Sequence, residues 1–145
     1  MTFKILTDST ADLPESWTQE HDVQVLGLTI QLDGQTYETV GPDKLTSEQL
    51  LAKMESGSKP TTSQINVGQF EDVFRQYAQE GTAVLYVAFA SALSGTYQSA
   101  VMAREMVLED YPEAIITILD TKAASMGEGL LVMKAVEARA AGQSL

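Results

Sequence analysis

Three short apolar segments of this chain each run into a loop rich in hydroxyl side chains, and amphipathic segments lie between them. The apolar segments cover residues 3–7, 83–89 and 114–119. Apolar strands that alternate with helical segments are typical of βα units around a parallel sheet. We therefore predict an α/β fold with a mainly parallel sheet flanked by helices.

The segment between residues 23 and 38 departs from this alternation. Residues 23–32 are predicted to form one strand, and Asp33-Gly34 followed by residues 35–38 is a strong hairpin signal, because Asp-Gly suits the tight turns that join antiparallel strands. We expect a β-hairpin insertion near residues 23–38. The polar stretch 58–65 is predicted to be a loop.

Capping residues and apolar spacing predict the helices. Asp12 and Pro14 suit the start of a helix that reaches about His21. Thr46 has capping-box spacing to Gln49 and opens a helix that ends near residue 56. Three further helices are predicted, one that starts after Asn66 and ends at Gly81, one over 98–109 and one over 127–141.

Length and composition limit the classes of function. A chain of 145 residues is long enough for one domain with a single core. A net charge of −11 argues against charge-driven binding to nucleic acid or to an anionic membrane surface. The sequence contains no cysteine, which excludes disulfides and thiol nucleophiles. It shows neither a signal-peptide segment nor a membrane span, so we expect a soluble, cytoplasmic protein.

Four loops are rich in hydroxyl side chains, at residues 8–10, 61–64, 91–96 and 120–127. Because the carboxyl ends of parallel strands share one edge of a sheet, three of these loops should converge there. The 91–96 loop lies before a predicted helix start, where backbone N–H groups are free, and contains no lysine, arginine or histidine. Neutral donors of this kind suit a singly charged carboxylate better than a phosphate ester.

Several residues in these loops allow more than one interpretation. Asp8 and Asp120 each follow a strand and could accept a phosphoryl group or bind magnesium. We favour the alternative, in which both carboxylates accept backbone N–H bonds and close their loops. For Thr62 and Ser94, ligand binding and helix capping are equally good interpretations of the spacing. A serine hydrolase is disfavoured, because Ser94 lacks the flanking glycines of a nucleophile elbow.

Two glycines near the last helix are also open to two interpretations. Gly127 and Gly129 could present backbone to a ligand, or they could permit close packing between a helix and a strand.

Taken together, four motifs of this chain resemble the DegV family, bacterial proteins that bind a fatty acid. They occur in the family's order, over residues 8–14, 62–64, 93–100 and 120–129. The resemblance implies that the hydroxyls of Thr62 and Ser94 hold the lipid carboxylate. It suggests supporting roles for Ser63, Gly95, Thr96 and Ser9, and a place in the wall of the tail pocket for Ala123, Ala124 and Met126.

The resemblance also implies a function. Proteins of this kind act as non-catalytic carriers that present a long-chain fatty acid to a separate fatty acid kinase, which makes an acyl phosphate for phospholipid synthesis. We accordingly expect no catalytic residue, no metal and no cofactor. The family normally has a second, C-terminal domain that helps to form the tail slot, so residues 1–145 would be the N-terminal α/β domain. The chain departs from the family at Ile65, where proline is usual, and at Ala90, where serine is usual.

Two other functions remain open from the sequence. The same hydroxyl-rich edge could belong to an enzyme or sensor for a small phosphorylated metabolite. The chain could also be an interaction module whose ligand is only structural.

Overall fold

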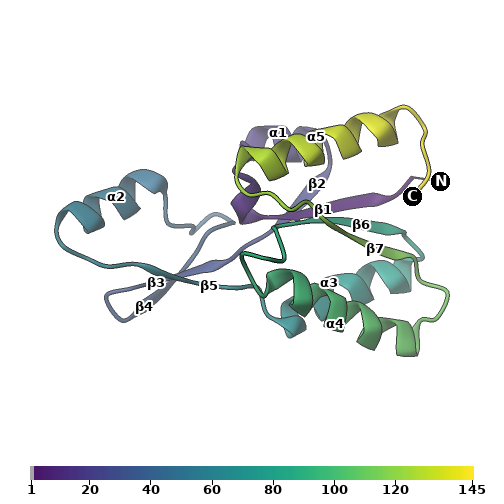
Figure 1. Cartoon of the computed structure of the whole chain (residues 1–145), viewed down its shortest axis with the longest axis horizontal. Helices are drawn as coiled ribbons and strands as arrows, with labels where there is room; N and C mark the ends of the chain where they lie inside the picture. Colours follow the sequence, from purple (N-terminus) through teal and green to yellow (C-terminus); the bar gives the residue numbers. More distant parts are fainter. Residues whose placement is uncertain (1) are drawn as a thin grey trace.

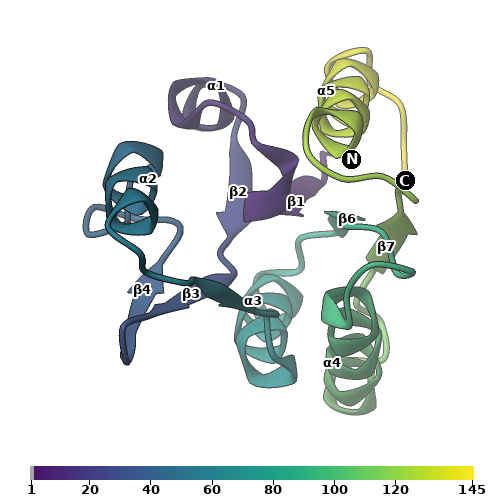
Figure 2. The same ribbon diagram turned by 60° about the vertical axis from the view of Figure 1, so that its left-hand side comes forward.

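A parallel sheet of four strands forms the centre of the structure, a computed structural model that describes residues 2–145 (Figures 1 and 2). Its strand order is β2-β1-β6-β7, and every neighbouring pair is parallel. The strands are β1 (Lys4–Asp8), β2 (Val23–Leu26), β6 (Val84–Ala88) and β7 (Ile116–Asp120). The predicted α/β fold with a parallel sheet is confirmed.

Helices cover both faces of this sheet (Figure 2). On one face, α3 (Val67–Glu80) and α4 (Thr96–Asp110) pack together, and on the other lie α1 (Glu15–Glu20) and α5 (Met126–Ala140). Neighbouring residues of β6 point to opposite faces, as they must in a strand. Tyr86 packs with Phe70 and Phe74 of α3, whereas Val87 packs with Val132 of α5. The core is therefore divided into two layers.

A small antiparallel sheet extends from one end of the parallel sheet (Figure 1). Its order is β4-β3-β5, with β3 (Thr29–Leu32), β4 (Gln35–Glu38) and β5 (Thr61–Ser63). We call this sheet and the adjoining helix α2 (Ser47–Glu55) the arm. The predicted β3–β4 hairpin is confirmed, and both turn residues, Asp33 and Gly34, have positive φ, as two-residue hairpin turns require.

Two predictions in this region were wrong. The single strand predicted over 23–32 is divided at Gly27, so that β2 joins the parallel sheet and β3 belongs to the arm. A Cβ atom on Gly27 would lie 2.7 Å from Val40 Cγ2, which shows how closely the returning chain passes. The loop predicted over 58–65 contains β5, in which Thr62 pairs with Ile30. Three polar residues carry no periodicity, so only the pairing reveals this strand.

The predicted starts of α2 and α3 are confirmed, whereas that of α1 was wrong. Thr46 and Asn66 each form the capping box that their spacing predicts. Asp12 does not cap α1, because it lies in the left-handed region (φ 53°) at the end of the 3₁₀ turn η1 (Ser9–Ala11). Its carboxylate instead accepts a hydrogen bond from Ser125 Oγ at 2.6 Å. Helix α1 begins only after Pro14.

Gly129 allows α5 to lie against η1. A Cβ atom there would approach the backbone oxygen of Ala11 to 2.8 Å. We expect Gly129→Ala to lower the free energy of unfolding by about 1 to 3 kcal/mol, although alanine is the better helix former. Urea denaturation measures this change. In the control Gly127→Ala, the nearest atom is Ala123 Cβ at 3.4 Å, and stability should stay equal or rise. Equal losses in both variants would contradict the packing role.

Candidate functional site

Three of the four hydroxyl-rich loops lie at the carboxyl edge of the parallel sheet, as predicted. Asp8 ends β1 and residues 9–10 follow it, residues 91–95 lie between β6 and α4, and residues 121–125 lie between β7 and α5. Backbone bonds join the last two loops, because Ala90 N donates to Ala123 O at 3.0 Å and Thr121 N donates to Ala88 O at 3.2 Å. Ser91 also donates to the Asp120 carboxylate from its backbone and its hydroxyl. The loops after β6 and β7 therefore form one unit.

The fourth loop reaches this edge through Gln64. The side chain of Gln64 lies over Gly95, since a Cβ atom on Gly95 would come within 2.3 Å of Gln64 Oε1. The missing side chain at Gly95 thus provides the space that Gln64 occupies. Directly after Gln64, the fully buried Ile65 fixes the loop in the core beside α3. The contact between Gln64 and Gly95 brings the segment 62–64 next to the segment 93–96.

Ser94 is half-buried at the start of α4. Its Oγ accepts a hydrogen bond from Thr96 N at 3.2 Å and donates to Thr96 Oγ1 at 2.9 Å. Gly95 occupies the N-cap position and has no side chain, so Ser94 satisfies the first free N–H of the helix from one residue earlier. Ser94 thus satisfies one N–H at the helix start, although Gly95 and not Ser94 is the N-cap residue. Ser94 remains half-buried at the same edge.

Thr62 and Ser63 are exposed on β5. The capping interpretation of Thr62 was wrong, because Thr62 lies within a strand and Asn66 caps the next helix. Within residues 2–145, no side-chain hydrogen bond involves the Thr62 hydroxyl. Its hydroxyl hydrogen is therefore available to a ligand.

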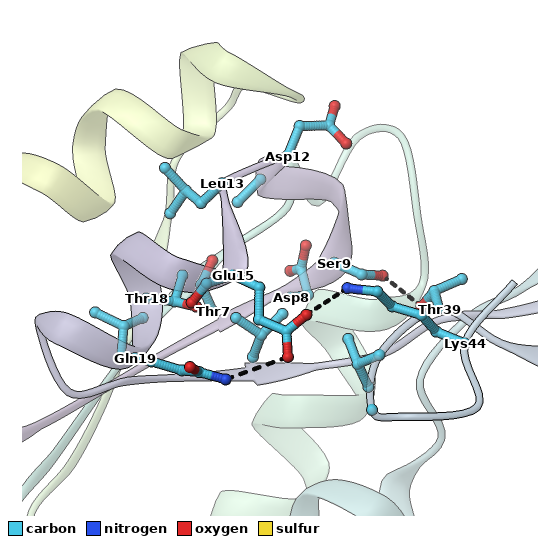
Figure 3. A pocket seen from close by; sticks show the side chains of 15 residues that line it. Thr7, Asp8, Ser9, Asp12, Leu13, Glu15, Thr18, Gln19, Thr39 and Lys44 are labelled. Carbon is cyan, nitrogen blue, oxygen red and sulfur yellow. Dashed lines mark hydrogen bonds and ion pairs between the residues drawn. The ribbon is translucent and has the colours of Figure 1, made fainter. Parts of the chain in front are cut away.

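Ser9 contributes to a different region. Its Oγ accepts hydrogen bonds from Leu28 N at 3.1 Å and from Thr39 Oγ1 at 3.0 Å, and these bonds tie the loop after β1 to the arm. Ser9 also lines a cavity of about 260 Å³ between α1, β2 and the segment 39–44 (Figure 3). At its rim Lys44 forms an ion pair with Glu15 at 2.6 Å. Neither of the predicted carboxylate-binding residues lines this cavity.

Asp8 and Asp120, the last residues of β1 and β7, close the loops that follow, which confirms the favoured interpretation. The buried Asp8 carboxylate accepts hydrogen bonds from Phe89 N at 3.0 Å and from Thr10 N at 3.2 Å. Asp120 accepts hydrogen bonds from the backbone N–H groups of residues 91 and 122. The hydrogen bond from the Ser91 hydroxyl is the main cause that lowers the pKa of Asp120. Both carboxylates are thus used within the fold.

The predicted tail-wall residues lie in the loop after β7 and at the start of α5. Ala123 is half-buried, whereas Ala124 and Met126 are exposed, the latter by 44%. Other apolar side chains of the joined loops and α5 are open to solvent, among them Leu93 by 67% and Leu130 by 58%. These side chains give the edge an apolar character beside its hydroxyls. No helix within residues 2–145 is both long and apolar enough to cross a membrane.

Sequence reasoning missed Glu128, which is fully buried beside Asp8. Its carboxyl oxygens contact Thr7 Oγ1 at 3.2 Å and Thr10 Oγ1 at 2.7 Å. Burial first, and then the charge of Asp8, raise the pKa of Glu128 to about 9. One signal could have found it: Glu128 precedes Val132 and Val136 at intervals of four, which is the buried face of α5.

Comparison with known proteins agrees with these features. Residues 2–145 match the family model described as "Uncharacterised protein, DegV family". A DegV domain-containing protein of Streptococcus pyogenes serotype M1 is 59% identical over the whole chain, which covers 51% of that relative. A relative from Lactococcus lactis is 50% identical and is half covered. The chain thus spans about half the length of these curated relatives.

Two solved structures share the fold and were described with their ligand class. A stearic acid-binding protein from Eubacterium ventriosum has a TM-score of 0.91 at 33% identity, over 99% of this chain and 49% of that one. A fatty-acid-binding DegV family protein from Thermus thermophilus has a TM-score of 0.84 at 36% identity, over 100% of this chain and 50% of that one. With a family model that matches all but the first residue, this chain belongs to the DegV family.

Proposed function

We propose that this chain binds a long-chain fatty acid and holds its carboxylate with the hydroxyls of Thr62 and Ser94. The observation that carries the proposal is the seating of Gln64 over Gly95, because it brings the two hydroxyl motifs together at one edge. The two related structures described as fatty-acid-binding proteins support the ligand class.

The hydroxyls at this edge suit a carboxylate for a chemical reason. A carboxylate that leaves water must keep its hydrogen bonds, or several kcal/mol are lost. Ser94 Oγ and Thr96 Oγ1 lie 2.9 Å apart. The Thr96 hydroxyl can therefore donate to Ser94 Oγ, which leaves the hydroxyl hydrogen of Ser94 free to bind the ligand. The exposed Thr62 hydroxyl supplies a second donor. Ser63 and the backbone of Gly95 are candidates for further support.

The apolar side chains beside this edge provide a place for the start of the lipid tail. Ala123, Ala124 and Met126 would form its wall, and each buried CH₂ group contributes about 0.8 kcal/mol. The relatives are twice as long as this chain. We propose that residues 1–145 correspond to the N-terminal domain of such a protein, and that a C-terminal domain encloses the rest of the tail.

The finer function follows from the resemblance. A carrier of this kind works in the cytoplasm, performs no catalysis and presents its fatty acid to a separate fatty acid kinase. The kinase would then form the acyl phosphate used in phospholipid synthesis. A hydroxyl-lined edge that leaves the carboxylate accessible is what such a hand-over requires.

Ligand identification tests the proposal. We would purify the chain under native conditions beside the full-length Streptococcus pyogenes relative, denature both and analyse the released small molecules by mass spectrometry. Long-chain fatty acid should be recovered from both, and added fatty acid should raise the melting temperature of delipidated protein. Recovery of a nucleotide or sugar phosphate, or stabilisation by magnesium and nucleotide alone, would instead support the phosphorylated-metabolite alternative.

A further inference from the structure

Two carboxyl groups lie together in the interior, at the junction of β1, η1 and α5. Asp8 and Glu128 are both fully buried. The Thr10 hydroxyl bridges them, because its Oγ1 contacts Asp8 Oδ1 and lies 2.7 Å from Glu128 Oε2. Within residues 2–145 no lysine, arginine or histidine forms an ion pair with either carboxyl group. Two negative charges in this place would therefore repel each other without a cationic partner.

The hydrogen bonds around the pair contain two hydrogens too few if both groups are ionised. Thr7 Oγ1 contacts Glu128 Oε1 at 3.2 Å and the Val87 carbonyl oxygen at 3.0 Å, and both can only accept. Thr10 Oγ1 likewise lies between an oxygen of Asp8 and one of Glu128. Each hydroxyl has a single hydrogen, so two hydrogens serve four acceptor contacts. A proton on one carboxyl group supplies one of the two missing donors.

The surroundings decide which carboxyl group holds that proton. Asp8 accepts hydrogen bonds from Tyr86 OH at 2.6 Å, Phe89 N at 3.0 Å and Thr10 N at 3.2 Å, so its negative charge is well compensated. Within residues 2–145, the only hydrogen-bond donors that contact the Glu128 carboxyl group are the two threonine hydroxyls. As a neutral acid it can donate to Thr7, whose own hydrogen then goes to the Val87 carbonyl.

We propose that Asp8 and Glu128 bind one proton at neutral pH, carried by Glu128, and that this proton fastens the start of α5 to β1 and η1. Asp8, at the end of β1, lies beside Glu128, and the charge of Glu128 also acts on Tyr86 of β6, whose hydroxyl donates to Asp8. Asp12, after η1, accepts a hydrogen bond from Ser125 at the start of α5. The proton thus acts as a structural ligand between the end of β1, η1 and the first turn of α5.

The pH dependence of stability follows from this geometry. Burial, the charge of Asp8 and a hydrogen bond with Asp8 raise the pKa of Glu128 to about 9 in the folded chain, against an ordinary value of 4.5. The folded state then binds one proton more than the unfolded state between these values. The stability that this proton contributes is fully present below pH 4.5, and it is lost as the pH rises toward about 9. The ionisation of Tyr86 does not contribute to this pH dependence, because burial raises the pKa of Tyr86 above its already high ordinary value.

The substitution Glu128→Gln tests the proposal, because glutamine is a permanently neutral group that can donate to Thr7 and accept from Thr10. Chemical denaturation would be followed from about pH 6 to about pH 8 in both proteins. Relative to the variant, the unfolding constant of the original chain should rise about tenfold per pH unit. Glu137→Gln, an equal charge change at an exposed position of α5, should leave the slope of the original chain unchanged. Parallel pH profiles of the original chain and Glu128→Gln would overturn the proposal.

Spectroscopic measurements detect the proton itself, and the second of them does not depend on how well the variant folds. The infrared difference spectrum between the original chain and Glu128→Gln, both at neutral pH, should contain the carbonyl stretch of a buried protonated carboxyl group. In NMR spectra of the chain labelled with ¹³C-glutamate, the chemical shift of the Glu128 δ-carbon should change at a much higher pH than the shifts of the other glutamates. A Glu128 signal that is already ionised at neutral pH would refute the assignment.

Discussion

The double substitution Thr62→Ala and Ser94→Ala is expected to abolish the retention of a long-chain fatty acid through purification. Each hydroxyl donates to a carboxylate that has left water, so each single substitution should weaken binding by about 1 to 3 kcal/mol, or roughly 5- to 150-fold. The two losses need not add, because both groups contact the same ligand. Titration with a fluorescent fatty acid, together with mass spectrometry of retained lipid, measures the effect.

Two controls separate binding from folding. Thr61→Ala removes an exposed hydroxyl from the same strand, on the face opposite to Thr62, and should leave binding unchanged. Ser94→Asp keeps a side-chain acceptor for the Thr96 N–H but places a negative charge against the carboxylate. It should preserve the melting temperature and still eliminate binding. Normal fatty-acid retention in the double variant would assign Thr62 and Ser94 purely structural roles.

The elements that the sequence predicts best are those with a strong local cause. Thr46 and Asn66 cap their helices because a side-chain oxygen can satisfy free N–H groups wherever the chain turns into a helix. Asp33 and Gly34 form the expected hairpin because both accept a positive φ. The convergence of three hydroxyl loops follows from parallel pairing alone. These features need no knowledge of distant contacts.

The features that sequence reasoning missed depend on partners far along the chain. Strand β5 exists because Thr62 pairs with Ile30, and three hydroxyl-bearing residues show no strand periodicity of their own. Asp12 looked like a helix cap, but Ser125, 113 residues away, bonds its carboxylate. Glu128 is buried because β1 and η1 lie against it, a contact that sequence reasoning did not anticipate. The candidate site combines both cases, since Ser94 follows from local spacing and Gln64 does not.

Replacing one carboxylate oxygen of Asp8 by an amide NH₂ group is expected to destabilise the fold more than the same change at Asp120. We expect Asp8→Asn to lower the free energy of unfolding at neutral pH by about 2 to 4 kcal/mol, because hydrogen bonds to a charged acceptor are strong and buried donors are costly to leave unpaired. Each carboxylate oxygen of Asp8 accepts from a different backbone N–H, Oδ1 from Thr10 and Oδ2 from Phe89. Whichever way the new amide is turned, its NH₂ group faces one of these donors.

Asp120→Asn is the matched control, because the geometry of that carboxylate lets an amide replace it. Both backbone donors, Ser91 N and Lys122 N, point to Oδ1, and Oδ2 contacts only the Ser91 hydroxyl, which can equally accept a hydrogen bond. The free energy of unfolding should change by less than about 1 kcal/mol. Denaturation of both variants in the same buffer gives the comparison. A loss in Asp120→Asn as large as that in Asp8→Asn would show that charge alone, and not the direction of the donors, determines the role of these aspartates.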